Sequence, residues 1–139
     1  MVYYSVLSNQ STTSRTGTIT IGDQTFTVTQ SGRQPDISVK PSPVNFGGLK
    51  TNKSSSKTVK ITNSGAAPLS IGDINITDSG SFSISKNGCS KKALQKNKSC
   101  AATIKFSPAS TGQYNGTLTI QSNDADTPTA AISLQGIGI

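Results

Sequence analysis

One stretch of the sequence, from Cys89 to Asn123, indicates how this chain folds. It reads CSKKALQKNKSC, then AATIKFSP, then ASTGQYNGTLTIQSN. The two cysteines, which are the only ones in the chain, bracket ten residues that include four lysines. An alternating segment then runs to Phe106, and a Gly-x-Tyr triplet ending at Tyr114 leads into a second alternating segment. Apolar residues at every second position predict strands with one buried face.

The composition favours many short β-strands joined by turns. Of the 139 residues, 32% are hydrophobic, 14% are charged and 40 are serine or threonine. Threonine suits half-buried strands, and the 13 glycines suit turns. A disordered chain is the alternative interpretation, but the apolar residues alternate in register instead of scattering.

Several residue types needed for common catalytic sites are missing. The chain has no His, Trp or Glu, so acid–base chemistry would rest on six Asp. A His–Cys nucleophile and a His-ligated metal are excluded. We therefore expect a protein that is not an enzyme, with no cofactor and no metal site.

The net charge of +7 comes mostly from 11 lysines in residues 36–139. Nucleic-acid sites usually combine basic residues with Arg and aromatic side chains, whereas these lysines are dispersed on strand faces and in two loops. We interpret them as a solvated surface rather than a polyanion site, and we expect no nucleic-acid partner. No run of 18 apolar residues occurs, so we also expect no membrane insertion.

Residues 1–32 are rich in threonine and contain no lysine. Val2–Leu7 predicts a short strand, and residues 16–30 predict a hairpin that turns at Gly22-Asp23. Three strands with one apolar face are too few to fold alone, so a larger β domain is expected. The residues predicted to share the apolar face of the hairpin are Ile19, Ile21, Phe26 and Val28.

This N-terminal segment is similar to a known domain over about a quarter of the chain. The matching residues are Tyr4-Ser5-Val6, Ser8-Asn9, Ser14–Ile21 and Thr25–Gln30. They resemble the C-terminal part of a BACON domain, so residues 1–32 are expected to be a truncated BACON-like β domain. The tryptophan-bearing N-terminal half of that family has no counterpart here.

Residues 33–35 are expected to be a linker, because Pro35 interrupts any strand. In residues 36–139, about seven short alternating segments and no helical period predict an immunoglobulin-like β-sandwich. Pro41 and Pro43 place the first strands at an edge, and a phase shift at Gly72-Asp73 predicts a β-bulge. The segments are Ile37–Val39, Val44–Phe46, Thr58–Asn63, Leu69–Thr77, Phe82–Ile84, Ala102–Phe106 and those around Leu118 and Ile132.

Cys89 and Cys100 are predicted to form a disulfide. A metal site or a redox pair is the alternative, but a C-x₂-C spacing would be expected for either, and no His could complete a ligand set. A disulfide implies an oxidising compartment. We therefore expect an extracellular or cell-surface location, with the periplasm as an alternative and any signal peptide outside this chain.

Tyr114 precedes an alternating segment, as does the tyrosine corner of immunoglobulin-like sandwiches, in which the hydroxyl bonds nearby backbone. A ligand-stacking role is the alternative. Asp124 and Asp126 are candidates for a Ca²⁺ site, but calcium takes six to eight oxygen ligands. A turn is the preferred interpretation of these two residues.

Several motifs in residues 36–139 together resemble one family. They are Val44–Gly47, Lys60–Gly65, Pro68-Leu69, Cys89, Cys100, Phe106–Pro108, Gly112–Ile120, Ser122–Asp124, Pro128 and Leu134–Gly136. The segment is similar to a bacterial ASH (Hydin-type) domain, a relative of the major-sperm-protein-like immunoglobulin fold. The resemblance implies a non-catalytic module that is often repeated in large secreted or surface proteins.

The leading functional hypothesis is a spacer or adhesion scaffold whose partners are neighbouring domains of the same polypeptide. Carbohydrate binding, to mucin or another glycan, is the alternative, because BACON-like domains often accompany glycan-degrading enzymes. Tyr3 and Tyr4 are its only candidate contacts, since the four Phe are patterned for cores. A third hypothesis is binding of another protein by β-strand addition at an open edge.

Overall fold

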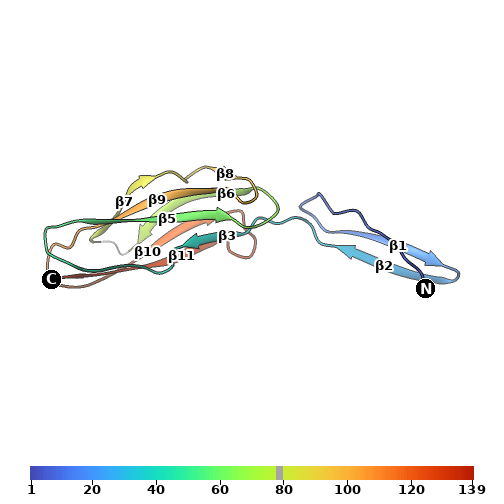
Figure 1. Cartoon of the computed structure of the whole chain (residues 1–139), viewed down its shortest axis with the longest axis horizontal. Coiled ribbons are helices and arrows are strands. Elements are labelled where there is room, and N and C mark those ends of the chain that lie inside the picture. The colour runs from blue at the N-terminus through green and yellow to red at the C-terminus, as the bar shows by residue number, and fades with distance from the viewer. Residues whose placement is uncertain (78–79) are drawn as a thin grey trace. The chain divides into compact units, whose positions relative to one another are not determined.

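The computed structural model describes residues 1–77 and 80–139, and these residues contain strands but no helix (Figure 1). The chain divides into two compact units, Met1–Gln34 and Pro35–Ile139. The strands are β1 (Arg15–Ile21), β2 (Gln24–Gln30), β3 (Ile37–Lys40), β4 (Val44–Leu49), β5 (Ser55–Asn63), β6 (Leu69–Thr77), β7 (Phe82–Asn87), β8 (Ala93–Leu94), β9 (Ser99–Phe106), β10 (Gly112–Ser122) and β11 (Thr129–Gly138).

The first unit is built on the antiparallel hairpin of β1 and β2, in which Ile19 lies opposite Phe26. The predicted turn is present, and Gly22 has a φ of 59°, a conformation that favours glycine. The opposite face of the hairpin carries threonine only. Its cross-strand pairs are Thr16 with Thr29, Thr18 with Thr27 and Thr20 with Thr25.

The predicted strand at Val2–Leu7 is wrong, because no strand precedes β1. The backbone carbonyl of Leu7 instead accepts hydrogen bonds from the side chains of Arg15 and Gln30. The prediction that all four Phe are core residues is also wrong, because Phe26 is 55% exposed. A two-stranded hairpin has no second layer to cover it. Assignment of residues 1–32 to a BACON-like domain stays a prediction.

The second unit is a sandwich of a five-stranded sheet, in the order β4-β11-β10-β6-β8, and a four-stranded sheet, in the order β3-β5-β9-β7. The predicted all-β, immunoglobulin-like fold class is thereby confirmed. Within residues 35–77 and 80–139 the sandwich has nine strands rather than about seven, in part because β8 contributes a two-residue pairing with β6.

Between β3 and β4, near the start of the sandwich, the chain passes from one sheet to the other. β3 pairs with β5 in one sheet, and β4 pairs in parallel with β11 in the other. Pro41 and Pro43, both after cis peptide bonds, lie in the crossing between them. Both strands are at sheet edges, as the prolines predicted, because proline cannot donate to a strand ladder.

The phase shift predicted at Gly72-Asp73 is a bulge. Ile120 pairs with Ile74 and Ser122 pairs with Ile71, so β6 has one extra residue here. Apolar side chains therefore remain on the buried face on both sides of the bulge, since Ile71 and Ile74 are both buried.

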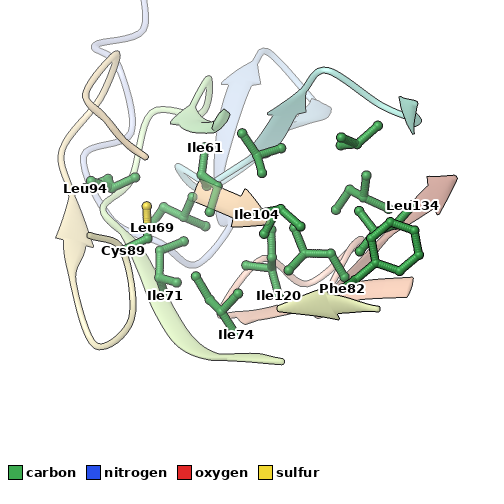
Figure 2. Packing of buried hydrophobic residues seen from close by; sticks show 14 of the residues in the cluster. Ile61, Leu69, Ile71, Ile74, Phe82, Cys89, Leu94, Ile104, Ile120 and Leu134 are labelled. Carbon is green, nitrogen blue, oxygen red and sulfur yellow. The ribbon is translucent and has the colours of Figure 1, made fainter. Parts of the chain in front are cut away.

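The core lies between the two sheets and is filled from both (Figure 2). Ile61 and Ile104 come from the four-stranded sheet, and Ile120 and Leu134 come from the five-stranded sheet; all four are fully buried. Fully burying one such side chain stabilises the fold by about 1.5–3 kcal/mol before conformational entropy is counted.

Aromatic side chains close one part of this core. The ring of Phe106 lies 4.9 Å from Phe82, 5.5 Å from Phe46 and 5.6 Å from Tyr114, measured between centroids. The last pair meets edge to face, which is a favourable arrangement of aromatic quadrupoles. This cluster fixes the ring of Tyr114 in place.

Candidate functional site

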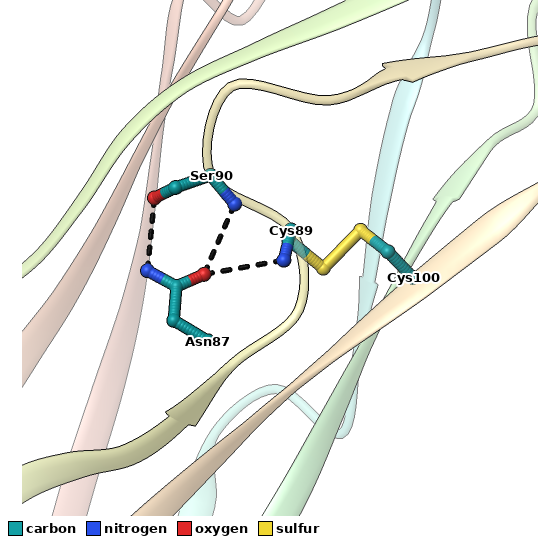
Figure 3. The surroundings of a disulfide bond; sticks show 4 residues. All are labelled: Asn87, Cys89, Ser90 and Cys100. Carbon is teal, nitrogen blue, oxygen red and sulfur yellow. Dashed lines mark hydrogen bonds between the residues drawn. A yellow bond between two sulfur atoms is a disulfide. The ribbon is translucent and has the colours of Figure 1, made fainter.

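The predicted disulfide is present and joins Cys89 to Cys100 with a Cα–Cα distance of 5.3 Å, within the usual range (Figure 3). Cys89 is fully buried, and Cys100 lies on β9. Asn87 shapes the turn before the bond. Its Oδ1 accepts hydrogen bonds from the backbone N–H groups of Cys89 at 3.2 Å and Ser90 at 3.0 Å.

The lysine-rich loop between the cysteines is held against β6. The N–H of Ile71 donates to the carbonyl of Lys92 at 2.7 Å, and the N–H of Lys91 donates to Gly72 at 3.3 Å. The ammonium group of Lys91 also lies 2.7 Å from Asp73, but both side chains are more than half exposed, so this ion pair adds little stability. The loop is therefore stabilised by covalent and backbone bonds more than by charge.

Tyr114 bonds back to Ser110, four residues earlier in the chain. Its hydroxyl donates to the carbonyl of Ser110 at 3.0 Å and accepts from the Ser110 N–H at 3.1 Å. Hydrogen bonds with Ser110 lower the pKa of Tyr114 from its ordinary 10.0; the bond with the Ser110 side chain has the largest effect, and the bond with the Ser110 backbone has the next largest. This is the geometry that a tyrosine corner requires, and the structural role of Tyr114 stays a prediction.

The candidate ligand contacts Tyr3 and Tyr4 are 85% and 64% exposed and lie outside any strand. The hydroxyl of Tyr3 donates to the sulfur of Met1. Tyr4 lines a shallow hollow of the first unit together with Val6, Ile19 and Val28. Tyr3 is not among the residues that line this hollow.

Asp124 and Asp126 form a turn between β10 and β11. Oδ1 of Asp124 accepts from the N–H groups of Asp126 at 3.0 Å and Thr127 at 3.3 Å. Across residues 1–77 and 80–139, no group of three or more acidic or cysteine side chains is arranged to hold a metal ion. Nor does any helix in these ranges reach the length and hydrophobicity of a membrane span.

One buried polar residue, to which the sequence patterns assigned no role of its own, anchors the start of the sandwich. Asn63 is fully buried, and its Oδ1 accepts from the N–H groups of Asp36 at 3.3 Å and Gly65 at 3.0 Å. Its amide nitrogen donates to the carbonyls of Ala67 at 2.7 Å and Leu94 at 2.9 Å. The Asn-Ser-Gly sequence at residues 63–65 was the only local signal for such a turn.

The sandwich begins and ends at opposite ends of its long strands (Figure 1). Asp36 lies beside Ser64, which follows the last residue of β5. Ile139 exchanges backbone hydrogen bonds with Leu49 and Thr51, which precede the first residue of β5. The nine residues of β5 span about 30 Å, so the two ends are separated by the length of the sandwich.

Comparison with known proteins places this geometry in a family. The model of the family described as Cep192 domain 4 matches residues 34–139. A human structure, the ASH/PapD-like domain of CEP192 (PapD-like domain 7), matches 76% of this chain and 87% of its own length, with a TM-score of 0.59 and 14% identity. The comparison with curated proteins finds no match.

Two further solved structures share the fold. The periplasmic chaperone SfaE matches 74% of this chain and 58% of its own, with a TM-score of 0.53 and 13% identity. The secreted serine protease VesC from Vibrio cholerae matches 73% of this chain at a TM-score of 0.60 and 19% identity. Only 23% of VesC is covered, so the likeness concerns one part of that protease.

Proposed function

This chain belongs to the Cep192 domain 4 family, and from that membership and the geometry of its sandwich we propose that it is a non-catalytic spacer and interaction module of a multidomain secreted or cell-surface bacterial protein. Its immediate partners are neighbouring domains of the same polypeptide. The observation that carries the proposal is the separation of Asp36 and Ile139 by the full length of the sandwich. A module with this geometry adds its own length to the protein that contains it.

Both ends are anchored, as a spacer requires. At the start, the N–H of Ile37 donates to Asp124 at 3.0 Å, and the hydroxyl of Ser64 donates to the Asp36 carboxylate at 2.6 Å. At the far end, the N–H of Ile139 donates to Leu49 at 3.0 Å. Tension applied to the two ends is therefore transmitted to strands that are bonded into the sheets.

The direction of pairing also suits a module under tension. β4, near the start of the sandwich, runs parallel to β11, which ends it, with Val44 opposite Leu134 and Leu49 opposite Gly138. When the two ends of the sandwich are pulled apart, β4 is pulled back toward its start and β11 is pulled toward its end. The two parallel strands are therefore loaded in shear, in opposite directions along their length. The bonds of the ladder then resist together instead of opening one at a time.

The disulfide supports an exported location. Such bonds persist in oxidising environments and are rare in the cytosol. The likeness to a secreted protease and a periplasmic chaperone concerns the fold alone, because the identities are 19% and 13%.

Small-angle X-ray scattering on one copy and on two copies of the full chain joined end to end tests the spacer role. We expect the second copy to increase the maximum dimension by at least about 30 Å, the length of the long strands. A two-copy protein that folds back, with a maximum dimension close to that of one copy, contradicts the proposal. The same fusion carrying Asp126→Ala, an exposed side chain, serves as a folding control.

Binding of another protein by strand addition is a second candidate, favoured by the hairpin of the first unit. Phe26 and Ile21 are 55% and 42% exposed on one face of a sheet with only two strands. Such a sheet is marginal alone, and its free edges are templates for another strand. Size-exclusion chromatography with light scattering tests self-association; concentration-dependent dimers that Phe26→Ser abolishes would support it, and a strict monomer would count against it.

A further inference from the structure

The outer face of the four-stranded sheet has an unusual composition. Twelve positions on it point away from the core, as the alternation of burial and the pairing registers show. Four are lysine, seven are serine or threonine, one is alanine, and none is acidic, aromatic or large and apolar. These residues, called the lysine face below, are Ser38, Lys40, Ser56, Thr58, Lys60, Thr62, Ser83, Lys86, Ser99, Ala101, Thr103 and Lys105.

Two of these lysines are placed against each other. Lys40 of β3 lies directly opposite Lys60 of β5, and both side chains are exposed. Opposed residues of antiparallel strands have Cβ atoms about 4.5–5.5 Å apart, and like charges in that position are destabilising. Among the described residues the one ion pair found joins Lys91 to Asp73, which is on the other sheet. An anion bound between Lys40 and Lys60 would relieve their repulsion.

The remaining two lysines extend the positive charge over the same face. Lys86 of β7 lies opposite Thr103, and Lys105 of β9 lies opposite both Ser56 and Ser83. Each of these two lysines therefore has a residue with a hydroxyl group directly opposite it in the sheet. The side chains between the lysines are small, so a long ligand can lie flat across the four strands.

The outer face of the five-stranded sheet differs from the lysine face, because its strands carry no lysine. The exposed positions of β10 and β11 carry only uncharged side chains, such as Asn115 opposite Gln135 and Thr117 opposite Ser133. The exposed positions of β6 include Asp73 but no lysine. The two outer faces of the sandwich thus differ in charge, which solubility alone does not require.

We propose that the lysine face binds an acidic polysaccharide, with the four ammonium groups contacting its carboxylate or sulfate groups and the seven hydroxyls contacting its own hydroxyl groups. Charge complementarity selects an anion, because four cations share a face with no acidic side chain. The hydroxyls select a ligand that is itself rich in hydroxyl groups. This binding goes beyond the spacer role and does not depend on it.

Other polyanions fit the face less well. Protein interfaces depend on buried aromatic or apolar anchors, and binding of single-stranded nucleic acid depends on aromatic stacking. The lysine face offers neither, since its largest uncharged side chain is threonine. An anionic membrane would be attracted by the lysines, but the hydroxyls would contribute no specific contact.

Affinity electrophoresis and calorimetry of the full chain with polygalacturonate and dextran sulfate test the proposal, with neutral dextran as the uncharged probe. We expect binding to both acidic polymers that weakens about tenfold or more between roughly 50 and 200 mM salt, because counterions are released. Replacing Lys40, Lys60, Lys86 and Lys105 by Gln should weaken binding about tenfold or more and flatten the salt dependence. No binding by the natural chain, or equal binding to dextran, overturns the proposal.

The matched control is K50Q/K92Q compared with K40Q/K60Q, because both double variants remove two exposed positive charges. Only K40Q/K60Q should weaken binding; equal losses would mean attraction by net charge and overturn the proposal. Circular dichroism and thermal melting confirm that each variant is folded.

A second comparison tests the hydroxyls. Thr58 and Thr103 are directly opposite, and their hydroxyl oxygens are 3.4 Å apart. T58V/T103V should weaken binding of polygalacturonate several-fold and leave binding of polyglutamate unchanged. Polyglutamate that binds as tightly as polygalacturonate would identify an acidic protein as the partner instead. Binding restricted to phosphatidylserine vesicles would identify a membrane, and either result overturns the proposal.

Discussion

Asp124 and Ile37, 87 residues apart in the sequence, are joined by a hydrogen bond of 3.0 Å from the backbone N–H of Ile37 to Oδ2 of Asp124. Asp124 is 3% exposed, and its other carboxylate oxygen, Oδ1, accepts from the N–H groups of Asp126 and Thr127. One side chain therefore shapes the turn between β10 and β11 and also anchors the first strand of the sandwich.

Asp124→Ala should destabilise the protein, because three backbone N–H groups lose their acceptor. An unsatisfied buried donor costs about 1–3 kcal/mol. We expect a loss of about 2–3 kcal/mol in urea denaturation. Asp126→Ala, at an exposed position of the same turn, is the control and should change stability by less than about 0.5 kcal/mol. Equal effects of the two changes would contradict this role of Asp124.

Gly136→Ala should also destabilise the sandwich. A Cβ at this position would lie 2.5 Å from two ring atoms of Phe106, which is fully buried against other aromatic rings. Overpacking of this kind costs about 1–3 kcal/mol. Gly48→Ala is the control, because its Cβ would lie 3.4 Å from the side chain of Ile139. The midpoint of urea denaturation should fall for Gly136→Ala only.

Removing the disulfide by replacing Cys89 and Cys100 with Ala should lower stability by about 2–3 kcal/mol, since a cross-link restricts the unfolded chain. Equilibrium denaturation without reductant measures this loss, and reductant should destabilise only the natural protein. A thiol assay on the folded, unreduced protein should detect no free thiol. Two reactive thiols would contradict the disulfide.

Tyr114→Phe should lower the melting temperature by a few degrees, because Ser110 loses its side-chain partner. The effect should also depend on pH. The folded state lowers the pKa of Tyr114 from 10.0, so ionisation of this group favours folding. That contribution is complete above pH 10.0 and is lost as pH falls through the lowered pKa.

The measurement for Tyr114 is the difference in stability between the natural protein and Tyr114→Phe, at neutral pH and above pH 10.0. Taking the difference cancels every effect of pH that the two proteins share. We expect the difference to be larger at the higher pH. A difference that is zero at both pH values would contradict the tyrosine corner.

The strands that the sequence predicted best are those whose alternation is long and regular. Around Leu118 and Ile132 every second residue is apolar, and these residues are buried in β10 and β11. The pattern failed at Val2–Leu7, where alternation is also present but no neighbouring strand pairs with it. A strand needs a partner for its backbone groups, and local sequence does not reveal that partner.

The buried polar residues show the same limit. Asn63 and Asp124 look like turn residues in the sequence, and both do shape turns. Their contacts with Asp36 and Ile37 depend on distant segments meeting at one end of the sandwich. No short motif in the sequence predicts that these distant segments contact each other.

Local patterns were sufficient for the all-β class, the pairing of the two cysteines, the bulge in β6 and the edge position of the two proline-flanked strands. Each of these follows from properties of neighbouring residues: side-chain period, loop composition and the missing N–H of proline. The distribution of charge over the surface, by contrast, could not be predicted from local patterns. In the sequence the lysines are dispersed, but the order β3-β5-β9-β7 brings four of them onto one face and sets Lys40 against Lys60. Strand order is fixed by burial of the whole core, so only the folded chain could reveal this face.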